Sequence, residues 1–180
     1  YASPESLNRP LLYRYDLRLR DNYRVPLEAR FLILLPELEV KGYKSPSIKR
    51  WLDEIDNNII IPRNLLHVGF ISDFFGIIPL ELSSTFPMGQ YESIESLGIN
   101  DILYQNVEHK FETFFKMYGH HYNKCGVLIP DKYVNQFNEE TGYTKREIMI
   151  NLFEKIRLNF SLNISIFNEL SGVLEFFKVE

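Results

Sequence analysis

The sequence predicts an α/β protein of three layers, in which helices flank a mostly parallel central sheet. Short, continuous apolar runs recur along the chain, and such runs are typical of strands that are buried on both faces. Segments with apolar residues at helical spacing separate these runs, and this alternation favours a parallel sheet. The length of 180 residues suits one domain.

The composition limits the classes of protein to consider. Hydrophobic residues make up 45% of the chain, which is enough for a sizeable core, and the formal net charge is -4. Any nucleic-acid binding must therefore depend on a local basic surface or on another domain. The single cysteine, Cys125, cannot form an internal disulfide, and this favours a reducing, cytoplasmic setting. No apolar run approaches the ~20 residues of a membrane helix, so we expect no membrane partner.

The N-terminal segment predicts an amphipathic helix. Ser3-Pro4-Glu5 is typical of a helix start, and residues 11–20 continue the helical spacing. The chain begins with Tyr rather than Met, so we expect a fragment or a processed product. The densest basic cluster lies in this segment, which is either a solvated helix face or a surface that contacts phosphates or another domain. Its candidate RNA-contacting residues are Arg14, Arg18 and Arg24, with Arg20 between them.

Strands and helices then alternate. The run 30–35, ended by Pro36, predicts a buried strand, residues 47–56 predict a helix, and residues 65–71 predict a second core strand. Asn100 begins a long helix to Tyr118, which is the clearest helical pattern in the chain. A third strand follows at 126–130.

The C-terminal part is partly ambiguous. Asp131 is expected to cap a short helix that ends near Gly142. Thr144 and Glu147 match a capping box, which predicts a further helix to about residue 160. Residues 161–180 fit either a helix or an edge strand. We therefore expect a single α/β domain over 1–160, with its N-terminal helix, followed by a tail over 161–180.

The segment 67–92 is the candidate site. After the apolar run it carries Gly76, Pro79 and the carboxylate Glu81. Because ligand sites of open α/β sheets lie at the carboxyl ends of strands, this loop is a candidate ligand site. The alternative is a packed strand–loop–strand shaped by Gly and Pro. His120-His121 lacks the spacing of a metal pair, and we expect neither a metal nor a cofactor.

Residues 74–92, FFGIIPLELSSTFPMGQYE, resemble a segment of the archaeal tRNA-guanine transglycosylase and archaeosine synthase family. Gln90 stands where the family has His, and Glu92 stands where it has Asp. The opening ASPESLNRPLLYRY also resembles the family's lead-in to its middle α/β domain. The direct matches are Gly76, Pro79, Glu81, Leu82, Pro87 and Tyr91.

A second stretch resembles the family's synthase loop, but with changes. Pro36, Lys41 and Tyr43 match that loop, whereas Glu37 and Leu38 replace its Cys and Ser. The resemblance therefore implies synthase chemistry that is altered or lost. The chain is also too short for a transglycosylase (β/α)₈ barrel of ~250 residues, so it resembles the middle domain alone.

Three functions remain open. The first is a domain or split subunit of a tRNA-modification protein of the archaeosine (7-deazaguanine) pathway, which supports tRNA binding or assembly with a transglycosylase or synthase subunit. The second is an active transferase or amidation-type enzyme that uses the loop 76–92, with Glu81 as general base and Lys41 and Tyr43 across the pocket. The third is a non-enzymatic interaction module, in which the aromatic face of the long helix binds a partner.

Overall fold

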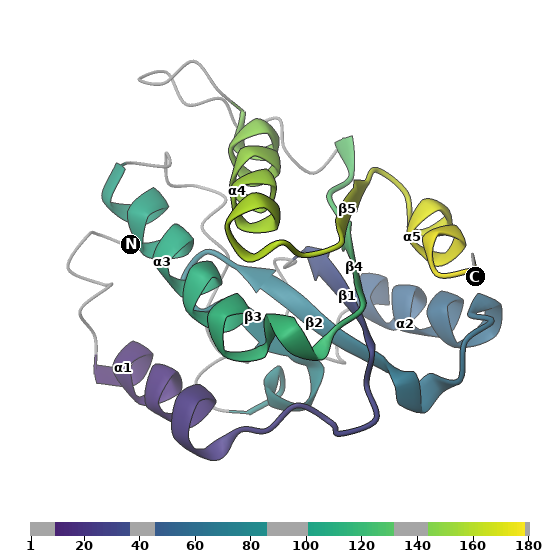
Figure 1. The fold of residues 1–180 in the computed structure, drawn as a ribbon, viewed down its shortest axis with the longest axis horizontal. Helices are drawn as coiled ribbons and strands as arrows, with labels where there is room; N and C mark the ends of the chain where they lie inside the picture. The colour runs from purple at the N-terminus through teal and green to yellow at the C-terminus, as the bar shows by residue number, and fades with distance from the viewer. Residues whose placement is uncertain (1–9, 37–45, 86–100, 132–143, 179–180) are drawn as a thin grey trace.

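The computed structural model describes residues 10–36, 46–85, 101–131 and 144–178. Within them, a five-stranded sheet of order β3-β2-β1-β4-β5 lies between two layers of helices (Figure 1). The three-layer α/β fold predicted from the sequence is thus confirmed. The strands are β1 (Phe31–Pro36), β2 (Leu66–Ser72), β3 (Gly76–Pro79), β4 (Lys124–Leu128) and β5 (Ile164–Phe167).

The sheet is parallel except at one edge. β1 pairs with β2 and β4, and β4 pairs with β5, all in parallel. β3 instead runs antiparallel to β2, with Gly76 opposite Ser72 and Pro79 opposite Gly69. β1, β2 and β4 are apolar along nearly their whole length because helices cover both of their faces.

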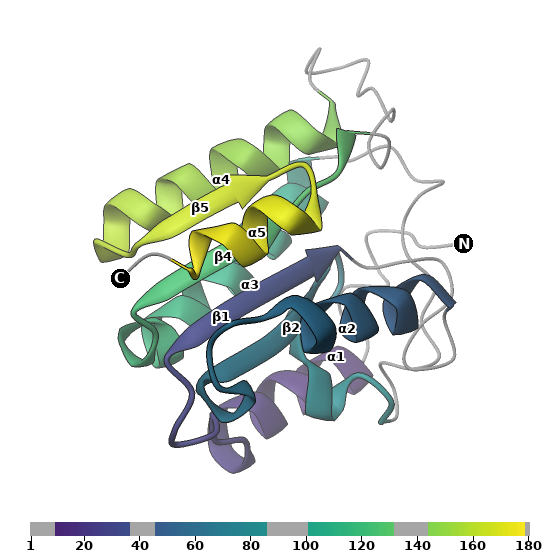
Figure 2. The same ribbon diagram turned by 90° about the vertical axis from the view of Figure 1, so that its right-hand side faces the viewer.

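The helices divide between the two faces, as Figure 2 shows for the face with α2 and α5. α1, α3 and α4 cover the opposite face (Figure 1). Their bounds are α1 (Pro10–Leu17), α2 (Pro46–Asn58), α3 (Asp101–Tyr118), α4 (Lys145–Phe160) and α5 (Leu170–Phe176). α4 begins with the predicted capping box, in which Thr144 and Glu147 satisfy each other's backbone N–H groups.

Two details differ from the sequence-based predictions, and a third cannot be compared with the structure. The third core strand lies at Lys124–Leu128 rather than 126–130. Residues 161–180, expected to be a helix or an edge strand, contain both: β5 pairs with β4, and α5 follows it. The helix expected after Asp131 falls largely at 132–143, outside the described residues.

The antiparallel strand β3 is the second strand of the strand–loop–strand alternative for residues 67–92, although its position and direction were not predicted. Its four residues are too few for a strand pattern, and Pro79 suggested a loop. Gly76 makes the tight turn from β2 with φ +76°, and a Cβ there would lie 2.7 Å from Cβ of Lys110. Only glycine fits this left-handed backbone at so close an approach.

The outer edge of β3 is covered by the N-terminal helix. The Tyr15 hydroxyl donates a hydrogen bond of 2.9 Å to the carbonyl of Ile77. Asp16 holds the buried Lys110 ammonium of α3, with both carboxylate oxygens 2.7 Å from Nζ. α1 therefore supplies a hydrogen-bond partner to a backbone carbonyl of this edge strand.

Candidate functional site

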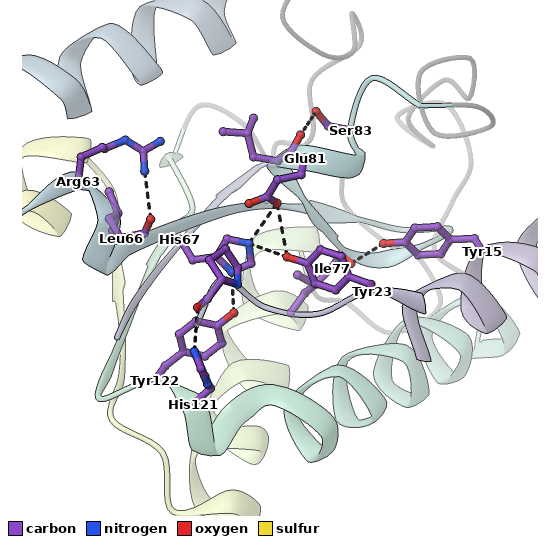
Figure 3. A network of polar contacts seen from close by, with 12 residues as sticks. Tyr15, Tyr23, Arg63, Leu66, His67, Ile77, Glu81, Ser83, His121 and Tyr122 are labelled. Atoms are coloured by element: carbon purple, nitrogen blue, oxygen red, sulfur yellow. Dashed lines mark hydrogen bonds and ion pairs between the residues drawn. The ribbon is translucent and has the colours of Figure 1, made fainter. Parts of the chain in front are cut away.

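The candidate site is a polar network at the amino end of the parallel strands, drawn in Figure 3. His67, the second residue of β2, is its centre and is 2% exposed. Tyr23 and Tyr122 approach the imidazole ring from two sides, and Glu81 reaches it from the turn after β3. Tyr23, Tyr122 and Glu81 come from three segments that are distant in the sequence, and we call these three residues together with His67 the His67 network.

Both ring nitrogens of His67 are hydrogen-bonded. Nδ1 lies 2.6 Å from the Tyr122 hydroxyl, and Nε2 lies 3.0 Å from the Tyr23 hydroxyl and 3.3 Å from Oε2 of Glu81. An ionised carboxylate only accepts hydrogen bonds, so we assign the proton of a neutral ring to Nε2. The Tyr122 hydroxyl then donates to Nδ1, and the Tyr23 hydroxyl donates to Glu81 over 3.4 Å. Each polar group of this buried set thereby has a partner.

Burial and charge shift the acidities in the His67 network. Desolvation, and then the nearby Glu81 carboxylate, raise the pKa of Tyr23 far above its ordinary value. Desolvation likewise raises the pKa of Tyr122. For Glu81, burial acts to raise the pKa. The hydrogen bond from His67, the charge of that ring when it is protonated, and smaller contributions from the Glu81 backbone and Tyr23 lower the pKa below 4.5. The two phenols therefore stay protonated, and Glu81 stays ionised at neutral pH.

Glu81 is the part of the network that solvent reaches, with 49% of its side chain exposed. It lies in a 3₁₀ turn, Leu80–Leu82, directly after β3. The hydroxyls of Ser83 and Thr85 each donate 2.8 Å bonds to carbonyls of this turn. Local bonds from side chains to the backbone can fix a short turn that is not part of a longer helix or strand. They therefore fix the backbone that carries Glu81.

Tyr23 is positioned by an unusual helix end. α1 continues into a π-helix, Arg18–Asn22, and Tyr23 follows it. The Tyr118 hydroxyl donates to the carbonyls of Leu19 and Tyr23, at 2.5 and 3.3 Å. π-helical turns are rare and often lie at functional sites, and here the wider turn ends at a residue of the His67 network.

The location of Glu81 corrects the sequence-based expectation. The loop was expected at the carboxyl ends of the strands, where ligands of open α/β sheets bind. Because β3 runs back along β2, it carries Glu81 to the amino end instead, beside His67. Gly76 and Pro79 belong to this hairpin as its turn and its last strand residue.

The other predicted site residues divide into two groups. Arg14, Arg18 and Arg24 are all exposed on or just after the N-terminal helix. Arg18 lies next to the Glu81 turn, with Nη1 3.4 Å from the Thr85 hydroxyl, and Arg24 donates to the Tyr23 carbonyl at 2.7 Å. The candidates outside the described residues are Lys41, Tyr43, Pro87, Gln90, Tyr91 and Glu92.

His67, Tyr23 and Tyr122 could not be identified from the sequence as members of the site. A single His inside an apolar strand is a weak pattern, although an imidazole between Leu66 and Val68 has to find polar partners once it is buried. Tyr23 and Tyr122 each follow a helix end, and neither position carries a motif. Their pairing depends on contacts across 44 and 55 residues of sequence.

The described residues contain neither a metal-binding cluster nor a membrane-spanning helix. No three or more His, Cys, Asp and Glu side chains are grouped there in a way that could hold a metal ion. None of the helices over this part of the chain has the length and apolarity to cross a membrane.

Comparisons with known proteins gave no match: no family model fits the chain, and no curated protein or solved structure is significantly similar to it.

Proposed function

We propose that this chain is a domain or split subunit of a tRNA-modification protein of the archaeosine (7-deazaguanine) pathway, where it supports tRNA binding or assembly rather than catalysis. Its partners would be tRNA and a transglycosylase or synthase subunit, in the cytoplasm. The observation that carries the proposal is the junction of two segments. The arginine-bearing segment 14–24 contacts the turn of Glu81, the residue that matches the family segment, through Arg18 and Tyr23.

Charge supports a binding role for this segment. Residues 10–24 hold four arginines and two aspartates, in a chain whose net charge is -4. The aspartates are occupied: Asp16 binds Lys110, and Asp21 lies 2.7 Å from Nε of Arg20. Arg14, Arg18 and Arg24 thus form a local excess of positive charge, which phosphates can neutralise.

The state of Glu81 favours binding over catalysis. A general base works best with a pKa near the working pH. The pKa of Glu81 is instead lowered, because His67 and Tyr23 together outweigh the effect of its burial. A carboxylate with a lowered pKa binds a proton weakly, so Glu81 is better suited to accept hydrogen bonds than to act as a general base.

The test is the salt dependence of tRNA binding. In an R14A/R18A/R24A triple variant we expect weaker binding and a slope of log K against log[salt] that is shallower by about 2 to 3, because each lost phosphate contact removes ~0.7–0.9 of slope. The matched control, R50A/K116A/K178A, removes three exposed charges from other surfaces and should leave the slope near that of the wild type. Equal slopes in the two triple variants would refute the proposal.

A further inference from the structure

Tyr13 is an exposed aromatic side chain that the fold does not use. Among the described residues, the large hydrophobic side chains most open to solvent are Tyr13 at 65%, Leu27 at 84%, Ile60 at 69% and Leu158 at 73%. α1 turns Leu12 and Tyr15 into the core, so Tyr13 projects to another side. A single exposed apolar residue is ordinary; Tyr13 differs from the other three in being aromatic and in its surroundings.

Arginines lie close to Tyr13 along the chain. Arg14 is its neighbour in sequence, and Arg14 and Arg18 lie one turn apart on the same helix face. Arg20 interacts with Tyr13 electrostatically: the pKa of Arg20 is raised first by the hydrogen bond that it donates to Asp21, then by the charge of Asp21, and further by Tyr13. Within the described part of the chain, Arg14 makes no ion pair, and Asp16 is held by Lys110.

An exposed aromatic ring in an arginine-bearing helical segment suits one kind of ligand. Proteins that bind single-stranded nucleic acid stack bases on aromatic side chains and hold the backbone with Lys and Arg. Sequence-specific RNA recognition also uses unpaired bases that stack on Tyr or Arg. A protein partner would instead require a contiguous apolar patch, whereas here a single exposed ring lies on a helix that also carries arginines.

We propose that Tyr13 stacks on an unpaired base of RNA while Arg14 and Arg18 contact the adjacent phosphates. This inference rests on the proposed tRNA-binding function and adds to it the feature that is bound, an unpaired loop nucleotide rather than a paired stem. Charge complementarity favours RNA as the ligand, because Tyr13 lies in the most basic segment of an acidic chain and RNA carries negative phosphates.

The test compares two RNA probes by fluorescence anisotropy: a hairpin with an unpaired loop, and the fully paired duplex of its stem. Tyr13→Ala should weaken binding of the hairpin about tenfold, since base–aromatic stacking contributes roughly 1–3 kcal/mol per base, and should leave duplex binding unchanged. Tyr13→Phe keeps the ring and should bind like the wild type. Leu158→Ala removes a comparably exposed side chain from α4 and should have no effect.

The slope of log K against log[salt] distinguishes this inference from the proposed tRNA-binding function on which it rests. Tyr13→Ala removes no charge, so its slope should equal that of the wild type. If the wild type binds RNA with an arginine-dependent slope but Tyr13→Ala binds the hairpin equally well, the stacking inference alone is wrong. Loss of affinity in Tyr13→Phe would also overturn it, because the hydroxyl rather than the ring would then make the contact. If the wild type binds neither probe nor tRNA, both proposals are wrong.

Discussion

The two ends of the sheet hold their polar side chains in opposite ways. At the amino end, His67 is buried and both of its ring nitrogens are hydrogen-bonded. At the carboxyl end, Asp131, Arg146 and Asn168 form a cluster in which Arg146 Nε lies 3.1 Å from Asp131, whose side chain is 69% exposed. Removing the partner of a buried polar group lowers the free energy of unfolding substantially, whereas an exposed ion pair contributes little to it. The same types of interaction should therefore carry very different energies at the two ends.

The largest effect is expected at His67. Replacing it with Leu leaves the buried Tyr122 hydroxyl without its partner and removes a partner from Tyr23 and Glu81. Since each unsatisfied buried group costs about 1–3 kcal/mol, we expect the free energy of unfolding to fall by about 3 kcal/mol, measured by urea denaturation.

A double-mutant cycle sharpens this prediction. Tyr122→Phe removes the hydroxyl that His67→Leu would leave unsatisfied, so the double variant should lose less stability than the sum of the single variants, by about 1 kcal/mol. Strict additivity of the two changes would mean that His67 and Tyr122 are not coupled.

The next effect tests how Glu81 reaches the amino end. Gly76→Ala forces a side chain into a left-handed turn and against Lys110, and such strain costs about 1–3 kcal/mol. We expect a lower free energy of unfolding by about 2 kcal/mol in the same assay. Gly172→Ala is not a suitable control, since a Cβ there would meet the Phe167 ring at 2.9 Å; Ser171→Ala, at an exposed helical position, should change stability by less than about 0.5 kcal/mol.

A smaller effect concerns pH. Glu81 has a lower pKa in the folded protein than its ordinary value of 4.5, so its contribution to stability is present above that value and is lost as pH falls through the folded pKa. Glu81→Gln should therefore lose less stability than the wild type between about pH 5 and pH 3. Because the carboxylate is half exposed, solvent screening keeps this difference small. Parallel curves of unfolding free energy against pH would show that His67 does not stabilise the anion.

The smallest effect belongs to the carboxyl end. Arg146→Ala removes an ion pair in which the Asp131 side chain is 69% exposed and the Arg146 side chain 26% exposed, and ion pairs that solvent reaches contribute about 0–1 kcal/mol. We expect a change below about 1 kcal/mol, well under that of His67→Leu. A loss as large as that of His67→Leu would abolish the contrast between the two ends.

The sequence predicted the parts of the fold that local patterns determine. The apolar run before Pro36 is β1, the 3–4 spacing up to Tyr118 is α3, and Thr144 with Glu147 caps α4. The position of β3 could not be predicted because four residues ending in Pro carry no periodic signal, and its direction depends on the turn at Gly76.

The candidate site was only partly predictable, for the same reason. Glu81 could be proposed from its place among Gly and Pro residues and from the family resemblance. Its partners could not, because Tyr23 and His67 meet only after α1 and the π-helix fold back along the sheet. The direction of β3 decides at which end of the sheet the Glu81 carboxylate lies. Because β3 runs antiparallel to β2, the carboxylate lies at the amino end and not at the carboxyl end.

Mapping the RNA contacts tests the central claim most directly. The protein would be crosslinked to bound tRNA by ultraviolet light, and the modified peptides identified by mass spectrometry. We predict crosslinks within residues 13–24 and 80–85, which run along the β3 edge to the amino end of the sheet. Crosslinks confined to the carboxyl-end cluster of Asp131, Arg146 and Asn168, or to the face formed by α2 and α5, would contradict the claim.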